Sequence, residues 1–503
     1  MKKRRINKIA IIGSGIMGSG IACHFANIGV EVLLLDIVPK TLNDKEKVQG
    51  FSLKDKVVRN RIVNTALKNA LKSKPNPIYS TKFTQRINTG NLEDDISKVK
   101  DVDWIMEVVV ERLDIKKQVF EALEKYRSPG TLITSNTSGI PIKFMSEGRS
   151  EDFQKYFCGT HFFNPARYLK LFEIIPGPKT DLEVLDFLNA YGEQFLGKTS
   201  VLAKDTPAFI GNRIGIFGIQ SLFHQVKALG LTVEEIDKLT GPVIGRPKSA
   251  TFRTADVVGL DTMCFVANTA YEKCINDPER ETFKIPDYLQ KMVDNEWLGQ
   301  KSKQGFYKKI DKGVIHSIDL DTLEYTPQNK KRYPGVRLAK EHFQLKDRLK
   351  ALVNSDDPAG EFVWEVTAKA LLYSANRLGE IADDIVNIDR AMRWGFGWEL
   401  GPFEAWDAIG LVESAERMKK ENKQIPKWVT EMLSTGNTSF YSRVEGFNCY
   451  WDVNKKDYLP IPTSQKELRF SNFKYNGSLI ENHWSASLID LGDGVAGVNF
   501  HSV

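Results

Sequence analysis

Two residues able to do acid–base chemistry stand twelve positions apart in an apolar part of the chain. His161, one of seven histidines, lies at the end of an expected strand, and Glu173 lies in the next one, Lys170–Ile175. Two neighbouring strands joined by a short loop would bring these side chains into contact. A carboxylate against an imidazole fixes the tautomer of the ring and raises its basicity. The pair is therefore a candidate dyad, although a buried histidine bonded to a structural glutamate has the same spacing.

A glycine-spaced turn near the N-terminus offers a second kind of chemistry, the binding of a diphosphate. Gly13, Gly15 and Gly18 lie between the apolar strand Lys8–Ile12 and a helical stretch that extends to about Gly29. The first glycine permits the tight turn, the second lets the backbone approach a pyrophosphate, and the third allows close helix–strand packing. The helix N-terminus favours an anion. Together these features predict a dinucleotide site, and the alternative is a glycine-rich turn in an ordinary βαβ unit.

An acid at the end of the next strand bears on which dinucleotide is bound. Glu31–Leu35 leads to Asp36, eighteen residues after Gly18. A carboxylate there accepts hydrogen bonds from the hydroxyls of the adenosine ribose. Ile37 and Val38 offer no cation for a 2′-phosphate. We therefore expect NAD rather than NADP.

The composition is that of an ordinary globular protein of several units. With 503 residues, the chain should divide into three or four of them. No apolar run reaches the roughly 18 residues that span a bilayer, and no cleavable apolar segment follows the basic start. Five scattered cysteines without a C-x-x-C pair indicate reduced thiols in a cytoplasm and no metal site. A net charge of +6 gives no support for nucleic-acid binding but could attract a small polyanion.

The elements that must position these residues form five segments. Alternating strands and helices over 1–203 predict a doubly wound parallel sheet, which is an α/β (Rossmann) fold. Such sheets bind ligands beyond the carboxyl ends of their strands, where Glu111 and Ser138 fall. Helical periodicity then predicts two all-α units in tandem, and the last segment is rich in strand formers. The expected boundaries are a helical unit at 204–310, a polar linker at 311–360, a second helical unit at 361–440 and a β-rich tail at 441–503.

The second helical unit reads as a degenerate copy of the first. Ile236-Asp237 recurs as Ile388-Asp389, and Asp256–Leu260 recurs as Asp407–Leu411, at offsets of 152 and 151 residues. The copy has nothing like Asn212-Arg213 at its start. We predict a structural duplicate that packs on the first unit as a pseudo-dimer within the chain, with further oligomerisation left open.

Several motifs, taken in order, resemble the L-3-hydroxyacyl-CoA dehydrogenase family. The match runs over roughly residues 6–310, and the second helical unit resembles the family's duplicated C-terminal domain. The motifs are Gly13–Gly18 with Asp36, Ser135–Ser138, His161–Pro165, Lys204–Pro207 with Asn212-Arg213, and Gly305–Tyr307.

The resemblance implies a role for each matching position. His161 would be the general base, Glu173 its orienting partner, and Ser138 and Asn212 the residues that bind substrate oxygens. The implied cofactor-binding residues are Gly13, Gly15, Ile16, Met17, Gly18, Asp36, Glu111, Lys116, Ser138, Asn164 and Lys301. The implied CoA contacts lie in the helix after the second strand, among Arg61, Lys68, Lys72 and Lys74, for which a solvated helix face is the alternative.

The activity that the resemblance implies is NAD-dependent oxidation of L-3-hydroxyacyl-CoA to 3-ketoacyl-CoA in fatty-acid β-oxidation. The expected partners are an acyl-CoA substrate and, in the pathway, a thiolase or hydratase. Two alternatives stay open: a dehydrogenase of a non-CoA hydroxy acid, and a non-catalytic NAD-binding scaffold.

The end of the chain alternates like a β-hairpin. Asp493-Gly494 is a turn signal between Leu488–Leu491 and Val495–Phe500. The hairpin resembles the opening of an enoyl-CoA hydratase-like domain, so we expect a truncated form of a longer multifunctional protein that does not hydrate enoyl-CoA. Alternatively, these strands pair with a sheet formed by Glu467–Trp484 at a natural terminus.

Overall fold

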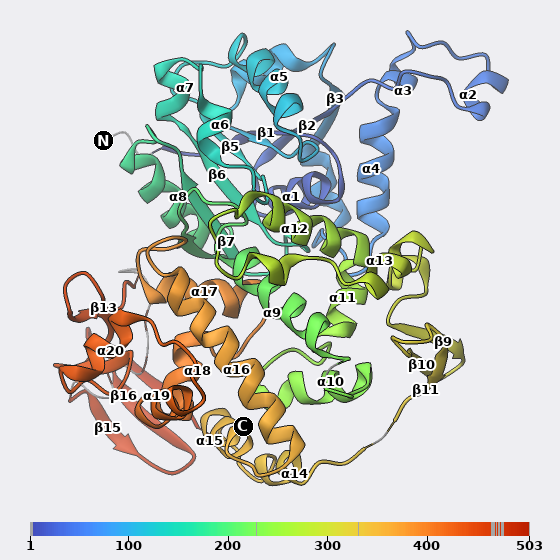
Figure 1. Ribbon diagram of the computed structural model, residues 1–503. Coiled ribbons are helices and arrows are strands. Elements are labelled where there is room, and N and C mark those ends of the chain that lie inside the picture. The colour runs from blue at the N-terminus through green and yellow to red at the C-terminus, as the bar shows by residue number, and fades with distance from the viewer. Residues whose placement is uncertain are drawn as a thin grey trace.

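The protein has an α/β half and a helical half that lie against each other (Figure 1). The computed structural model describes residues 4–501 except 228, 330, 464–467, 469, 471, 472 and 474–476. The α/β half holds about the first 200 residues, as the alternation of strands and helices predicts.

One sheet of eight strands forms the centre of the α/β half, in the order β3-β2-β1-β4-β5-β6-β7-β8. The chain order changes direction between β1 and β4, which is where doubly wound sheets bind ligands. The expected α/β class is therefore confirmed. The strands are β1 (Lys8–Ile12), β2 (Glu31–Asp36), β3 (Ile87–Asn91), β4 (Trp104–Glu107), β5 (Leu132–Ser135), β6 (Phe157–Phe162), β7 (Leu171–Pro176) and β8 (Thr199–Leu202).

The sheet is not parallel throughout, and in this respect the prediction was wrong. β6 and β7 pair antiparallel, whereas β7 and β8 pair parallel to each other. The connection between β6 and β7 is too short for a parallel crossover, which needs a dozen or more residues. The reversal sets His161 directly opposite Glu173 in the register.

Helices cover both faces of this sheet, and an insertion projects beside β2 and β3 (Figure 1). The covering helices are α1 (Ile16–Asn27), α5 (Leu113–Glu124), α6 (Ile142–Ser146), α7 (Glu151–Lys155) and α8 (Leu182–Gln194), with the short 3-10 helix η2 (Ile96–Asp101). The insertion holds α2 (Asp44–Val48), α3 (Lys56–Arg59), α4 (Arg61–Lys72) and η1 (Thr81–Arg86).

The first helical unit is built mainly from α-helices, as the periodicity predicts. Its helices are α9 (Gly211–Gln225), α10 (Val233–Thr240), α11 (Phe252–Val258), α12 (Leu260–Lys273) and α13 (Asp287–Asp294), with η3 (Pro242–Ile244), η4 (Arg280–Phe283) and η5 (Gln300–Ser302). A small antiparallel sheet follows, with β9 (Tyr307–Asp311), β10 (Val314–Ile318) and β11 (Tyr325–Pro327).

The segment 311–360, expected to be a linker, is folded. Besides β10 and β11 it contains α14 (Pro334–Ala339) and α15 (Leu345–Val353). Val336, Leu349 and Leu352 are buried in the core of the helical half. Each helix is short, so its few apolar residues stand isolated in a polar sequence, although they share one buried face.

The second helical unit repeats the first in its elements and also in its buried polar contacts. Its elements are α16 (Pro358–Arg377), α17 (Ile385–Gly395), α18 (Pro402–Ile409), α19 (Leu411–Lys420), α20 (Lys427–Ser434), β12 (Tyr441–Val444), β13 (Phe447–Asp452) and β14 (Asp457–Pro460). Asp256 accepts hydrogen bonds from the backbone N–H groups of residues 306 and 307. Asp407 does the same with those of residues 440 and 441.

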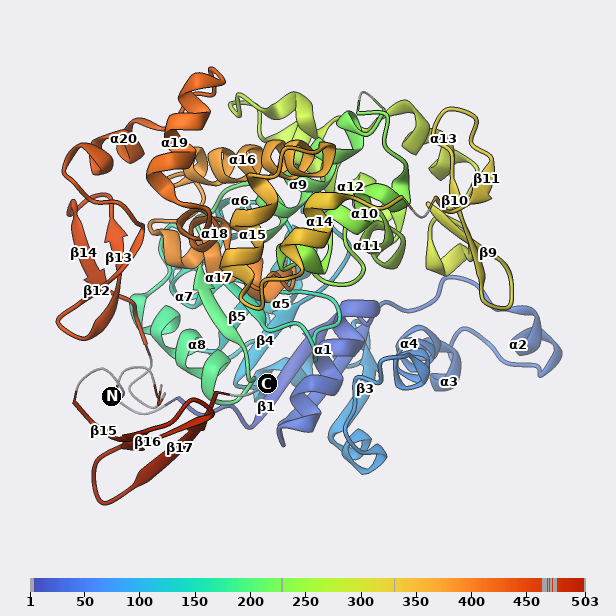
Figure 2. The ribbon, with the colours of Figure 1, turned by 90° about the horizontal axis from the view of Figure 1, so that it is seen from below.

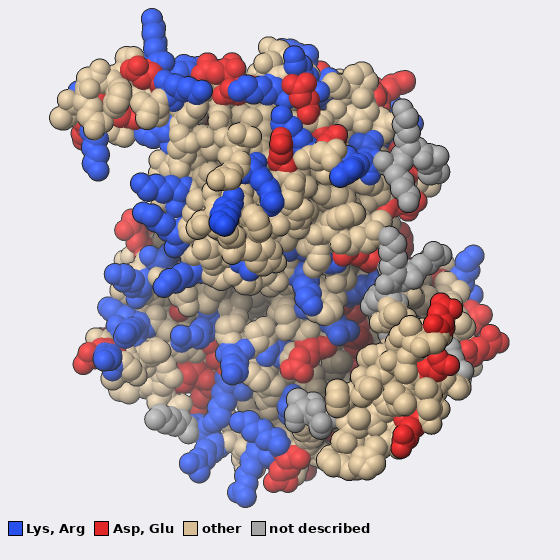
Figure 3. Space-filling model, turned by 180° about the vertical axis from the view of Figure 1, so that it is seen from behind, with Lys and Arg blue, Asp and Glu red and all other residues tan. Residues whose placement is uncertain are grey.

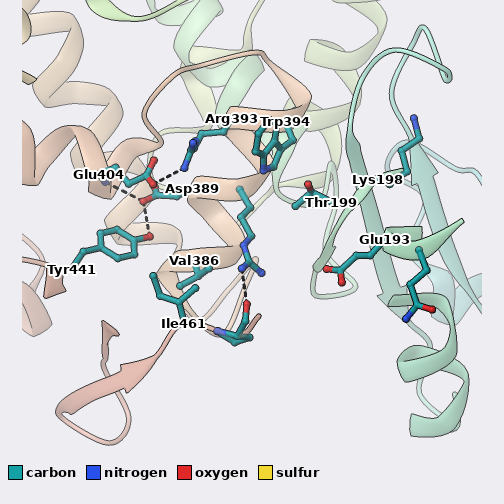
Figure 4. A pocket seen from close by; sticks show the side chains of 13 residues that line it. Glu193, Lys198, Thr199, Val386, Asp389, Arg393, Trp394, Glu404, Tyr441 and Ile461 are labelled. Atoms are coloured by element: carbon teal, nitrogen blue, oxygen red, sulfur yellow. Dashed lines mark hydrogen bonds and ion pairs between the residues drawn. The ribbon is translucent and has the colours of Figure 1, made fainter. Parts of the chain in front are cut away.

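A second pair of aspartates shows the same duplication. The hydroxyl of Tyr307 donates to Asp237, and that of Tyr441 donates to Asp389, each at 2.7 Å. Both aspartates also accept from backbone N–H groups at the start of the following helix. The hydrogen bond between Tyr441 and Asp389 is drawn in Figure 4. The repeat therefore continues through β12–β14, beyond the expected boundary at 440, because this small sheet corresponds to β9–β11.

The two helical units pack directly on each other, which confirms the predicted contact between the copies. The rings of Phe217 on α9 and Tyr373 on α16 stack with centroids 3.5 Å apart. Beside them, the buried guanidinium of Arg213 bonds Asp277 at 2.7 Å and Glu380 at 2.8 Å. The hydroxyl of Tyr373 accepts from Arg213 and donates to Asp277.

The last strands form a separate antiparallel sheet at one side of the molecule (Figure 2). The expected hairpin is confirmed as β16 (Ala486–Asp490) and β17 (Ala496–Phe500), and β15 (Leu479–Asn482) is the third strand. Asp493 and Gly494 take φ values of 51° and 75°, which this tight turn requires. Glu467, where the alternative sheet was expected to begin, lies outside the described residues.

Within the part of the chain that the structure describes, no helix combines the length and apolar character needed to cross a membrane.

Candidate active site

The glycine turn between β1 and α1 has the geometry that a bound diphosphate needs. Gly13 has φ +102°, and a Cβ there would lie 2.5 Å from the carbonyl oxygen of Val108. A Cβ on Gly18 would lie 1.9 Å from the carbonyl oxygen of Gly13, so this helix can approach the strand only with glycine. Beside Gly15 there is open space, since a Cβ would meet nothing within 4 Å. No side chain caps α1, so its N-terminal dipole is available to an anion.

Asp36 lies next to this turn, as the spacing predicts. One carboxylate oxygen accepts from the N–H and hydroxyl of Ser14, at 2.6 and 2.5 Å, and the other accepts from the N–H of Ile37. Asp36 is half-buried and Ile37 is exposed. The carboxylate is therefore held at the edge of the turn. These residues fit an NAD whose ribose meets Asp36 and whose diphosphate meets α1.

A buried lysine joins the last residue of β4, Glu107, to Glu111 just beyond the strand. The ammonium of Lys116 lies 2.8 Å from Glu107 and 3.3 Å from Glu111, and its side chain is 1% exposed. Glu111 in turn accepts from the hydroxyl of Thr137 and from the N–H of Ser138, at 2.6 and 2.8 Å. Burial raises the pKa of Glu111, but Lys116 and these donors lower it by more, so it stays below its ordinary value. Lys116, expected beside the cofactor, is thus enclosed and acts on the Ser138 loop through Glu111.

The predicted contact between His161 and Glu173 is confirmed. The Nδ1 atom of His161 lies 2.7 Å from a carboxylate oxygen of Glu173, and both side chains are buried. Phe163 and Phe209 pack against the imidazole, with ring centroids at 4.6 and 5.9 Å. The bond at Nδ1 leaves Nε2 as the nitrogen that could take up a proton.

The second oxygen of Glu173 connects this pair to helix α9. It accepts from the backbone N–H groups of Ile210 and Gly211, at 3.1 and 2.8 Å. Ala208 and Phe209, just before them, both have positive φ, at 64° and 50°. Such strain in residues other than glycine collects at functional sites. Asn212, the expected substrate-binding residue, is the next residue of this helix and is half-buried.

The other expected site residues occupy different positions. Ser138 is half-buried on the loop after β5, and Asn164 is exposed on the loop after β6. Lys301 lies on η5, where its ammonium bonds both carboxylate oxygens of Asp261 at 2.5 Å. Ile16 and Met17 form the first turn of α1, and Ile16 is 79% exposed.

The basic residues of α4 do not form one cationic site. Arg61 pairs with Glu46 of the insertion and donates to the carbonyl oxygen of Thr41, so its charge is compensated within the chain. Lys68 and Lys72 are exposed on the same side of the helix as Arg61. Figure 3 shows basic and acidic side chains interspersed along this edge of the molecule. The contact of these basic residues with CoA phosphates therefore stays a prediction.

Sequence reasoning missed two residues that organise the site. Glu107 accepts from Lys116, from the hydroxyl of Ser135 and from the N–H of Val109. Asn136 accepts from the N–H of Phe162 at 2.9 Å and so ties β6 to the loop after β5. A lone acid at the end of the apolar strand β4 was a signal for Glu107. Asn136 lies within the Ser135–Ser138 motif, but nothing local indicated its bond to β6.

Two cavities lie near these elements. The first, of about 450 Å³, is bounded by the glycine turn, α4 and the loop 164–167. The second, of about 590 Å³, lies between α8, β8 and α17 (Figure 4). Its charged groups bond one another or the backbone, as in the pairs Arg393–Glu404 and Arg390–Pro462. Only the first cavity adjoins the glycine turn.

Comparison with known proteins agrees with this geometry. The family description "3-hydroxyacyl-CoA dehydrogenase, NAD binding domain" matches residues 8–206, and its "C-terminal domain" counterpart matches 209–309. A probable 3-hydroxyacyl-CoA dehydrogenase of Bacillus subtilis is 50% identical over 499 residues. One of Deinococcus radiodurans is 45% identical over 305 residues, which are 61% of this chain and 83% of that protein.

A solved structure shows the same fold at lower identity. The 3-hydroxybutyryl-CoA dehydrogenase of Escherichia coli K12 is 22% identical, with a TM-score of 0.60 over 86% of this chain and 99% of that one. The alignment with the Bacillus subtilis protein covers 99% of the present chain but only 63% of that protein. Both family matches and the Deinococcus radiodurans relative agree on the affiliation: the chain belongs to the 3-hydroxyacyl-CoA dehydrogenase family.

Proposed function

We propose that this protein catalyses the NAD-dependent interconversion of L-3-hydroxyacyl-CoA and 3-ketoacyl-CoA, as a step of fatty-acid β-oxidation. The observation that carries the proposal is the buried His161–Glu173 pair, which is bonded to the start of α9 and lies in the half that holds the glycine turn. A scaffold that only binds NAD has no need of such a pair. Family membership supports the acyl-CoA substrate.

In this proposal His161 is the general base. Its Nδ1 is held by Glu173, so Nε2 takes the proton from the C3 hydroxyl, and positive charge grows on the ring. The Glu173 carboxylate stabilises the imidazolium, while the N–H groups of Ile210 and Gly211 keep the carboxylate in place. In the reverse direction the imidazolium returns the proton to the oxygen at C3. A positioned acid–base group typically contributes about 10²–10⁴-fold in rate.

The remaining groups bind and orient. NAD, when bound, supplies the acceptor for the hydride that leaves C3. Asp36 and the N-terminus of α1 would hold its ribose and diphosphate, and the loop that Glu111 fixes would face the nicotinamide side. Asn212 and Ser138 would hold the substrate oxygens, which supplies the positioning part of catalysis.

The test is NADH oxidation with acetoacetyl-CoA, compared between the wild type and His161→Ala. We expect the substitution to lower turnover by two or more orders of magnitude and to leave the dissociation constant of NADH nearly unchanged. A folded His161→Ala protein with wild-type turnover would remove His161 from the mechanism. A wild type that reduces a free 3-keto acid but not acetoacetyl-CoA would favour the non-CoA alternative.

A further inference from the structure

The cavity beside the glycine turn is lined by a single charged residue among those that the structure describes. Its lining is formed mostly by small or apolar residues of the turn, of α1 and of α4, together with the loop 164–167. Among the described residues that line it, Arg167 is the one charged side chain. The face of α4 that lines the cavity carries Ala66, Asn69, Ala70 and Ser73. At 3.6 residues per turn this face lies away from Lys68 and Lys72.

The guanidinium of Arg167 is held in place without an acid. It lies over the ring of Tyr79, 3.8 Å from the centroid, and 4.9 Å from that of Tyr168. Its Nη1 donates to the carbonyl oxygen of Asn76 at 2.6 Å, and the hydroxyl of Tyr168 donates to the same oxygen. In the described part of the chain no carboxylate pairs with it. Most of its five N–H donors therefore remain available.

Two arginines of the insertion differ in this respect. Arg59 bonds Glu93 and Asp94, and Arg61 bonds Glu46. The charges of Arg59 and Arg61 are compensated by these carboxylates, whereas that of Arg167 has no such partner among the described residues. A fixed, uncompensated guanidinium on a cavity wall is arranged to receive an anion, and its planar fork matches a phosphate bidentately.

We propose that Arg167 binds a phosphate group of the nucleotide-bearing ligand that enters this cavity. The inference rests on the proposed function, which brings two such ligands to the site, acyl-CoA and NAD. The phosphates of CoA and the diphosphate of NAD share the chemistry that Arg167 recognises. The cavity adjoins both the glycine turn and the loop that follows His161, so either source can reach it.

The experiment compares Arg167→Gln with wild type for four ligands: acetoacetyl-CoA, acetoacetyl-pantetheine, free CoA and NADH. Acetoacetyl-CoA carries phosphates, whereas acetoacetyl-pantetheine has the same thioester and no phosphate. KM is measured for both thioesters by NADH oxidation, and the dissociation constants of free CoA and NADH are measured by calorimetry. Loss of one charge-assisted contact to phosphate should weaken the binding of the affected ligand by about tenfold or more. Arg167→Lys should retain part of the affinity, since it keeps the charge but loses the fork.

Arg86→Gln is the matched control. Arg86 also lies over an aromatic ring, that of Phe83, and donates to a backbone carbonyl, that of Ala26, but it is not part of the cavity wall. We expect it to leave all four constants near wild type, which separates loss of a phosphate contact from loss of a stacked arginine.

A higher KM for acetoacetyl-CoA and weaker binding of CoA, with an unchanged KM for acetoacetyl-pantetheine, support a contact with a CoA phosphate. Weaker binding of NADH supports a contact with the NAD diphosphate. An equal rise of KM for both thioesters, or unchanged binding of both CoA and NADH, overturns the proposal. If the wild type does not reduce acetoacetyl-CoA, the proposed function fails, and the calorimetric comparison still decides the role of Arg167.

Discussion

At the residue scale, the site depends on the different hydrogen-bond partners of the two carboxylate oxygens of Glu173. One faces His161 and the other receives the first N–H groups of α9, so one carboxylate orients the base and holds the helix that carries Asn212. A single substitution at Glu173 should therefore affect catalysis more than the binding of NADH.

Glu173→Gln keeps the shape of this side chain but not its charge. If the amide oxygen stays with the α9 N–H groups, the amide nitrogen faces His161 and favours the tautomer in which Nε2 already carries a proton. We expect kcat to fall by about 10²–10⁴-fold, with the NADH dissociation constant and the melting temperature close to wild type. Measured kcat near that of wild type in the folded variant would contradict this role.

Asp36 should select the cofactor. The carboxylate is fixed by Ser14 at the edge of the glycine turn, and no cation follows it in Ile37 or Val38. A 2′-phosphate would meet this negative charge. We expect kcat/KM for NADH to exceed that for NADPH at least tenfold, by the order-of-magnitude cost of such a charge contact. Equal values for the two cofactors would mean that Asp36 does not face the ribose.

At the scale of elements, the contact between α9 and α16 depends on a buried charged cluster. Tyr373→Phe keeps the ring stacked on Phe217 but leaves Arg213 and Asp277 each with one partner fewer. Losing hydrogen bonds between buried charged groups should cost about 1–3 kcal/mol of unfolding free energy. Urea unfolding measures the change, and Tyr126→Phe, at an exposed tyrosine, should cost almost nothing. Equal stability of the two variants would deny the cluster this role.

The duplicated aspartates predict a pH dependence of stability. Burial raises the pKa of Asp407 from 3.8 to about 7, although the N–H groups of Phe440 and Tyr441 oppose the shift. Between these two values the folded state holds a proton that the unfolded state releases, so wild-type stability falls as pH rises from about 4 to about 7. Asp407→Asn lacks this proton. The stability of wild type relative to the variant should therefore decrease over that range, by on the order of 2–4 kcal/mol, and stay level above it.

Thermal or urea unfolding at several pH values between 4.5 and 8 checks this prediction. A difference between wild type and Asp407→Asn that does not change with pH, or that increases with pH, would show that Asp407 is ionised in the folded protein throughout. The equivalent position of the first repeat, Asp256, has a pKa raised by burial to about 6 and should give a smaller change.

At the scale of the whole molecule, the second repeat covers a face of the first. Phe217 and Arg213 on α9 are each 1% exposed, and their partners Tyr373 and Glu380 come from the second repeat. Removal of residues from 331 onward would uncover this face and leave Arg213 with fewer partners. We expect the shortened protein to dimerise or aggregate, as light scattering would show. A monomer of unchanged solubility and stability would argue that the two repeats are independent.

The sequence by itself determined the features that depend on local pattern. Turn chemistry and periodicity over a few residues predict four of these features. They are the glycine turn with Asp36, the hairpin at 493–494, the main helices and the repeat of Ile236-Asp237. The contact of His161 with Glu173 also followed, because a short loop between two apolar strands leaves few other arrangements.

Only the tertiary structure decided which distant groups meet and which face of an element is used. Lys116 joins Glu107 to Glu111, and Arg213 meets Tyr373 across 160 residues, although no local pattern marks either contact. The repeat continues to β14, but the offset shortens from 151 residues to 134 at Tyr441, so a fixed spacing ends too early. Charge and periodicity describe what one segment can do, whereas a contact depends on the neighbour that packing places against it.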